Sequence, residues 1–205
     1  MAIVSDRTVV AGDAVDEPGA LTLPIYLAVG LPLGAMHENK TVHGGIRVGG
    51  ELHLIDPDRY ILWAAALQAR NLASILSLVN EGARYRAERH VQSLVDDGLV
   101  IRLEAPNSAS AHLDTHRLLP TGEGLGNHAN NEGACFIYGR IPGCQLRVDP
   151  ILYNVWGAST TAASLREVID VVAEAFERTY DEVASHVLAN LPLMMRAGIV
   201  LVDLS

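Results

Sequence analysis

The chain has 205 residues, of which 49% are hydrophobic and 19% are charged, and this composition excludes an intrinsically disordered protein. Its formal net charge of −9 disfavours a nucleic-acid partner, because affinity for phosphates usually comes from a basic excess. No apolar run approaches the roughly 18 residues of a membrane span. The N-terminus lacks the basic and apolar regions of a signal peptide, and two cysteines cannot build a disulfide framework. We therefore expect a cytoplasmic protein that has no contact with a membrane.

After an N-terminal tail (residues 1–21), the pattern predicts short strands and then helices. Strand-like segments occupy residues 24–29, 41–48 and 51–55, with glycines between them. Asp56 and Pro57 predict a helix start, because an aspartate caps free amides and proline fits the first helical turn. Apolar spacing then predicts three helices and a closing strand, at residues 57–70, from 71 to a stop at Gly82, 84–97 and 99–103.

The same order returns in the second half of the chain. The segment LHLIDPDRYILWAAA reappears as QLRVDPILYNVWGAS, with Asp56 matching Asp149 and Trp63 matching Trp156 at a constant offset of 93 residues. A collinear series of such matches indicates an internal repeat. We therefore predict a domain at residues 22–110 and a second at 111–205, joined near residues 105–111.

The second copy has its own strand and cap signals. Its strands are predicted at residues 116–119, 134–139, 144–148 and 198–204. Ser164 with Glu167, and Thr179 with Glu182, have the spacing of a helix-capping box. The resulting fold class is α+β, with two tandem winged-helix domains that each contain three short strands and three helices.

The second copy, from VDPILYNVWGAS to RAGIVLVD, resembles the PqqD-like domains known as RiPP recognition elements. These are winged-helix modules that hold the leader peptide of a ribosomally made precursor for modifying enzymes. The resemblance covers about residues 22–104 and 117–204. It implies a non-catalytic protein without a cofactor, whose partner is a precursor peptide or a modifying enzyme.

In that family the peptide is held as an added strand at the sheet edge, beside the third helix. Carried onto the first copy, the resemblance places the edge strand at residues 51–55 and the facing helix at residues 84–97. A cationic stripe on that helix favours an acidic peptide, and its counterparts in the second copy are nearly uncharged. If only one copy is a recognition site, we predict that it is the first, with the second serving as a packing or homodimer surface. The predicted peptide-binding residues are Glu51, His53, Ile55, Arg86, Arg89, His90 and Ser93.

The stripe of Arg86, Arg89 and His90 has two other interpretations. Winged-helix transcriptional regulators use this same helix to read DNA, and a solvated helix face also explains it. The first candidate wing, residues 105–116, has no lysine or arginine, which counts against DNA.

The aromatic pairs Tyr60–Trp63 and Tyr153–Trp156 follow the two predicted caps at the same spacing. A binding box is one interpretation. Repeated aromatics beside a helix start are more often core anchors, and we predict that role.

Motifs for catalysis or metal binding are weak. No nucleophile and base pair, P-loop or HExxH motif occurs. His112, Asp114 and His116 would share one face of a strand, yet lack a second ligand cluster. The glycine-rich residues 122–126 match the stretch at residues 30–34, which favours a strand-connecting turn over a dinucleotide loop. We expect no enzymatic activity, no metal and no cofactor.

Overall fold

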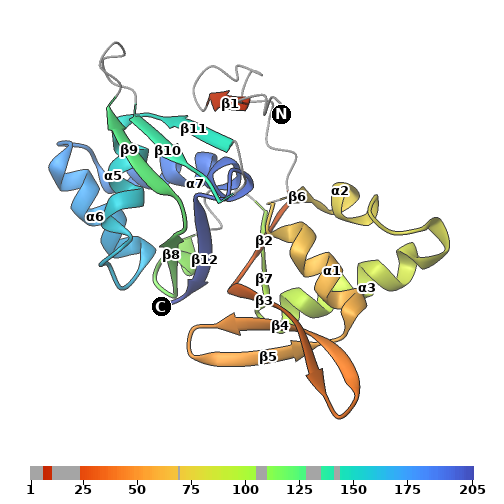
Figure 1. Ribbon diagram of the computed structural model, residues 1–205. Coiled ribbons are helices and arrows are strands. Elements are labelled where there is room, and N and C mark those ends of the chain that lie inside the picture. Colours follow the sequence, from red (N-terminus) through yellow and green to blue (C-terminus); the bar gives the residue numbers. More distant parts are fainter. Residues whose placement is uncertain (1–6, 11–23, 69, 105–109, 128–134, 141–143) are drawn as a thin grey trace, which may run out of the picture.

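Two segments of the computed structural model follow the same order of strands and helices, and the chain is an α+β protein (Figure 1). The structure describes residues 7–10, 24–68, 70–104, 110–127, 135–140 and 144–205. Repeat one is β2 (Ile25–Ala28), β3 (Leu31–Glu38), β4 (Thr41–Val48), β5 (Glu51–Ile55), α1 (Pro57–Ala66), β6 (Arg70–Asn71), α2 (Leu72–Leu76), a 3-10 turn (Glu81–Ala83), α3 (Arg84–Asp96) and β7 (Val100–Leu103). Repeat two is β8 (His116–Pro120), β9 (Glu123–Asn127), β10 (Cys135–Tyr138), β11 (Cys144–Val148), α5 (Pro150–Ala158), α6 (Leu165–Ala175), α7 (Tyr180–Arg196) and β12 (Val200–Leu204).

Strand pairing is also repeated. In repeat one β2 runs antiparallel to β7, with Ile25 opposite Leu103, and β3, β4 and β5 form a meander. In repeat two β8 runs antiparallel to β12, with His116 opposite Leu204, and β9, β10 and β11 form the second meander. Each repeat thus pairs its first strand with its last, and its meander ends with the strand, β5 or β11, that directly precedes the first helix in the chain.

The helix ends follow the sequence signals. The side chains of Asp56 and Asp149 accept backbone N–H groups at the starts of α1 and α5, as predicted. Thr179 and Glu182 form the predicted capping box of α7. Gly98 and Gly198 follow α3 and α7 in the left-handed conformation (φ of 71° and 68°), where glycine carries no steric penalty.

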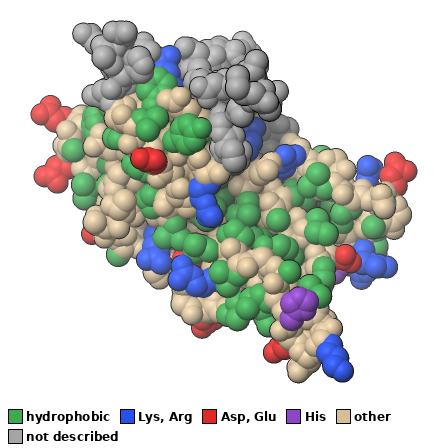
Figure 2. All heavy atoms as spheres, viewed as in Figure 1, with side chains coloured by type: hydrophobic (Ala, Val, Ile, Leu, Met, Phe, Trp, Pro, Cys, Tyr) green, Lys and Arg blue, Asp and Glu red, His purple; other side chains and the backbone are tan. Residues whose placement is uncertain are grey.

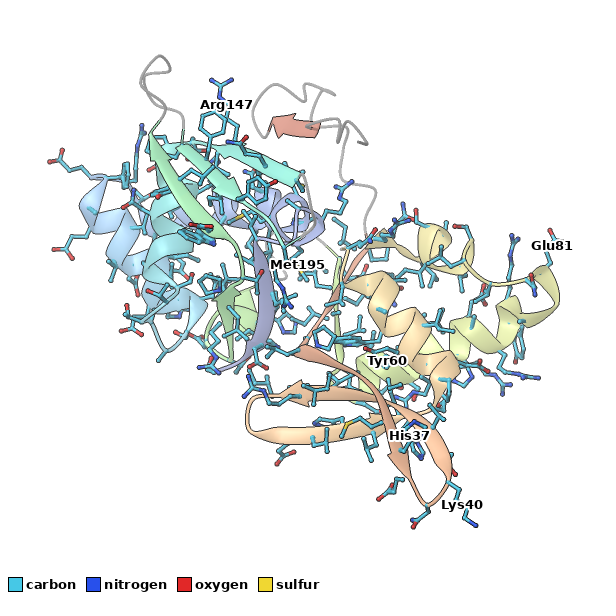
Figure 3. The ribbon with its side chains drawn as sticks, viewed as in Figure 1. His37, Lys40, Tyr60, Glu81, Arg147 and Met195 are labelled. Atoms are coloured by element: carbon cyan, nitrogen blue, oxygen red, sulfur yellow. The ribbon has the colours of Figure 1, made fainter. Side chains whose placement is uncertain are left out.

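The repeated tryptophans anchor the core, as predicted. Trp63 is fully buried and its Nε1 donates to the Val29 carbonyl at 3.1 Å. Trp156 donates in the same way to the Ile199 carbonyl at 3.1 Å. The Tyr60 ring stacks on Trp63 and extends from α1 towards the β3–β4–β5 sheet (Figure 3). A Cβ atom at Gly44 would lie 2.1 Å from the Tyr60 ring, so β4 needs glycine there.

The two repeats meet along β2 and β12. Val29 forms a parallel bridge with Val202, and the Gly30 N–H donates to the Val202 carbonyl at 2.7 Å. Asp203, which is fully buried, accepts from the Gly49 N–H at 2.7 Å. Arg117 lies 3.4 Å from the other Asp203 oxygen and supplies the opposite charge. A buried carboxylate needs such partners, because desolvation of an unpaired charge is costly.

The structure corrects several sequence predictions. Most of the glycine-rich residues 30–34 and 122–126 lie within strands β3 and β9 rather than in connecting turns, because they pair with β4 and β10. The second helix of repeat one covers five residues and then gives way to the 3-10 turn. Residues 112–116 are not one strand, since α4 (Ser110–Leu113) precedes β8. The predicted joint at residues 105–111 lies mostly outside the described residues.

Segment β1 (Arg7–Val10) falls within the predicted tail, and it pairs with repeat two. Among the described residues no helix is both long enough and apolar enough to cross a membrane.

Candidate functional site

A cleft of about 640 Å³ lies where repeat one meets the end of repeat two. Its first wall is the β4–β5 turn and the first half of β5. Its second wall is the end of α3 and the start of β7. Residues from α4 and from the ends of β8 and β12 complete it. The lining residues are Val48, Gly49, Gly50, Glu51, His53, Val95, Asp97, Gly98, Leu99, Val100, Ile101, Arg102, His112, His116, Leu204 and Ser205.

Two edge strands border this cleft. β5 is the outer strand of the β3–β4–β5 sheet, and β7 is the outer strand of the β6–β2–β7 sheet. An edge strand presents unpaired N–H and C=O groups, which form a template for another extended segment. The cleft therefore combines a space with a backbone able to hold a strand.

The residues of β5 divide between its two faces. Glu51 and His53 lie opposite the buried residues Val48 and Ile46 of β4, and they therefore share the inner face of the sheet. Leu52 lies on the other face and is 52% exposed. Figure 2 shows hydrophobic side chains gathered on the visible surface of repeat one. A strand added at β5 would therefore meet the cleft on one face and apolar side chains on the other.

Charges around the cleft are mixed and mostly paired. Asp97 is bound by the Arg59 guanidinium, and Arg102 is paired with Glu104 at 2.8 Å. Glu51 is exposed, and its Oε2 lies 4.0 Å from Nε2 of His53. Glu51 is thus the carboxylate of the β5 edge that is most available to a partner.

Two histidines at the floor of the cleft are held near each other. The rings of His112 and His116 meet edge to face, with centroids 5.3 Å apart. His116 is buried, and its Nδ1 lies 3.1 Å from the His112 carbonyl oxygen. Burial lowers the pKa of both rings. For His116, the His112 charge lowers the pKa further, while the His112 carbonyl and Asp203 act in the opposite direction. Both rings are therefore mostly uncharged at pH 7 and offer hydrogen-bonding nitrogens to this part of the cleft.

The predicted residues of α3 lie elsewhere. Arg86 and His90 line a shallow hollow against α1, next to Asp58 and Ile61. Arg89 is exposed, with its guanidinium 4.9 Å from the centre of the Tyr85 ring. From α3 only Val95 lines the cleft, together with Asp97 and Gly98, which directly follow the helix.

The structure thus places Glu51 and His53 in the cleft and does not bring Arg86, Arg89, His90 and Ser93 there. Ile55, at the far end of β5, is buried. Helical periodicity identified the polar face of α3, but it could not show that Arg86 and His90 lie beside α1 while Arg89 is exposed to solvent.

One group of three side chains in the described part of the chain could hold a cation. Donor atoms of Asp56, Asp58 and His90 lie within 4.8 Å of one another. Asp56 is already engaged, because its Oδ1 accepts the Arg59 N–H that caps α1. The two carboxylates are exposed at a helix start, where negative charge is stabilised without a metal.

In repeat two the equivalent sheet edge is occupied. β1 lies parallel to β11, with Arg7 opposite Cys144 and Val10 opposite Arg147. At the position equivalent to Arg86, His186 lies 2.6 Å from the Asp149 carboxylate. This hydrogen bond raises the pKa of His186.

The sequence patterns did not predict the contacts that Asp203 and His116 make where the two repeats meet. Asp203 interrupts the otherwise apolar strand VLVDL, and a lone acid in such a run is a signal of a buried polar contact. His116 carried no comparable signal, because its burial depends on α4 folding over β8.

The chain matches no protein-family model, and no curated protein or solved structure is significantly similar to it. What the chain binds is therefore inferred from its edge strands and its cleft.

Proposed function

We propose that this chain is a non-catalytic recognition protein of the cytoplasm, built from two tandem winged-helix repeats, that binds an extended peptide segment by strand addition to β5. The resemblance to RiPP recognition elements suggests the leader of a precursor peptide, or a segment of a modifying enzyme, as the partner. The observation that carries the proposal is that β5 is an edge strand and also lines a cleft of about 640 Å³.

Strand addition suits this edge energetically. Each backbone hydrogen bond contributes about 0.5–1.5 kcal/mol net, so a few bonds along β5 contribute a few kcal/mol whatever the peptide sequence. Selectivity then comes from alternate side chains, which enter the cleft beside His53 or lie on the outer face beside Leu52.

The sequence-based expectation of an acidic peptide depended on Arg86 and Arg89. Since neither side chain lines the cleft, and since the exposed charge of the β5 edge is Glu51, we propose a neutral or basic segment instead.

The test uses a displayed library of random peptides selected on the full chain, followed by fluorescence anisotropy with the enriched peptides. His53→Trp fills the cleft and should weaken binding by about tenfold or more, since peptide side chains lose their space. Leu78→Trp, at an exposed residue that lies outside both β5 and the cleft, is the control and should change affinity by less than about twofold. Equal effects of the two substitutions, or no enrichment of peptides, would contradict the proposal.

A further inference from the structure

The chain carries its own example of an added strand. β1 does not belong to the β9–β10–β11 meander, because it comes from the far end of the sequence and runs parallel to β11. The register is continuous over four residues, with Arg7, Thr8, Val9 and Val10 opposite Cys144, Gln145, Leu146 and Arg147. β1 is therefore bound to repeat two as a separate peptide segment would be.

The edge that β1 covers is the counterpart of the β5 edge. β11 and β5 are both the last strand of a meander and both are followed by an Asp-Pro helix start. At the offset of 93 residues, Cys144 corresponds to Glu51 and Val148 to Ile55. One edge is thus occupied, and β5 is the outer strand of its sheet, with no partner on that side among the described residues.

We propose that the segment recognised at β5 resembles β1: a basic residue followed by small β-branched residues, running parallel to β5. This inference rests on the proposed function and specifies its ligand.

Transfer of the register gives each position its neighbour. The residue in the place of Arg7 lies beside Glu51, whose side chain is 86% exposed, so a basic group there is paired. The residue in the place of Val9 lies beside His53 on the cleft face. The residues in the places of Thr8 and Val10 lie beside Leu52 and Leu54 on the outer face. β-branched residues suit all three of these positions, because they pack well on a pleated surface.

The direction of the ligand follows from the same comparison. A parallel neighbour of β5 starts near the β4–β5 turn and ends near the start of α1. Its first residue then lies at the Glu51 end, where the cleft is, and its last lies towards Ile55, which is buried.

The test uses a labelled peptide with the sequence of residues 5–12, SDRTVVAG, added to the full chain. We expect one peptide per chain and slower amide hydrogen exchange at residues 51–55. The reversed sequence, GAVVTRDS, has the same composition and should bind at least about tenfold more weakly. Protection confined to residues 144–148 would mean exchange with β1 on repeat two and would overturn the assignment to β5.

A charge reversal checks the register. Glu51→Arg should weaken binding of SDRTVVAG by about tenfold, and the peptide with Arg7→Glu should regain most of that loss on the same variant. No weakening, or no recovery, would overturn the pairing of the first peptide residue with Glu51.

Two failures are distinguishable. If library-selected peptides protect residues 51–55 but SDRTVVAG does not, strand addition at β5 stands and the likeness to β1 is wrong. If no peptide protects these residues, the proposed function fails as well.

Discussion

Asp203, in the last strand of repeat two, accepts a 2.7 Å hydrogen bond from the backbone N–H of Gly49, in the β4–β5 turn of repeat one. The carboxylate is fully buried, and Arg117 lies 3.4 Å from its second oxygen. This contact fixes the turn that precedes β5 against the other repeat. The wall of the cleft is therefore positioned by a polar contact between the repeats.

We predict that Asp203→Ala destabilises the chain by about 1–3 kcal/mol, because the Gly49 N–H and the Arg117 guanidinium lose their partner. Asp203→Asn keeps an oxygen acceptor for Gly49 and should cost less. Urea unfolding of the two variants measures both values. Equal stability of Asp203→Ala and the parent chain would show that the contact does not stabilise the junction.

Gly44 should resist substitution, while Gly82 should accept it. A Cβ atom at Gly44 would overlap the Tyr60 ring, and overpacking of this kind costs about 1–3 kcal/mol. Gly82 has open space around it and is exposed, so Gly82→Ala is the matched control. The difference in melting temperature between the two variants is the measurement, and a similar melting temperature for both would contradict the packing of Tyr60 on β4.

The pair His186–Asp149 predicts that the stability of the folded chain depends on pH. The hydrogen bond to Asp149 raises the pKa of His186 above 6.5, against the opposing effect of burial. The stability that this pair contributes is therefore fully present below pH 6.5 and is lost as the pH rises through the raised pKa. His186→Gln removes that contribution. The stability difference between parent and variant, measured by urea unfolding from pH 5 to pH 9, should shrink towards high pH. A stability difference that is the same at every pH would contradict the role of this hydrogen bond.

Arg86→Glu combined with Arg89→Glu separates peptide binding from DNA binding. Neither side chain lines the cleft, so peptide affinity should change by less than about twofold, and the melting temperature should hardly move. A large loss of peptide binding would show that Arg86 and Arg89 take part in peptide binding after all. Salt-sensitive binding of duplex DNA by the parent chain, lost in this variant, would instead favour the transcriptional regulator.

The sequence predicted the elements best where a local signal marks them. The caps at Asp56, Asp149 and Thr179 hold, because capping depends on neighbouring residues only. The strands β4 and β5 also lie where their patterns predicted them. β3 and β9 were missed because their glycines resemble turns, and only pairing with β4 and β10 makes them strands.

The candidate site was predicted in part. β5 was expected to be an edge strand, and in the structure it is one, with Glu51 and His53 lining the cleft. The predicted α3 residues do not line it, since a helical stripe specifies a face but not its neighbour. β1 was not predicted at all, because a four-residue strand becomes visible only through its long-range partner, β11.

Amide hydrogen exchange of residues 51–55, measured with and without saturating peptide, tests strand addition most directly. The account predicts that the outward-facing amides of β5 exchange more slowly in the complex, while the apolar core around Trp63 is unchanged. A peptide that binds tightly and leaves the exchange of all five residues unaltered would contradict it.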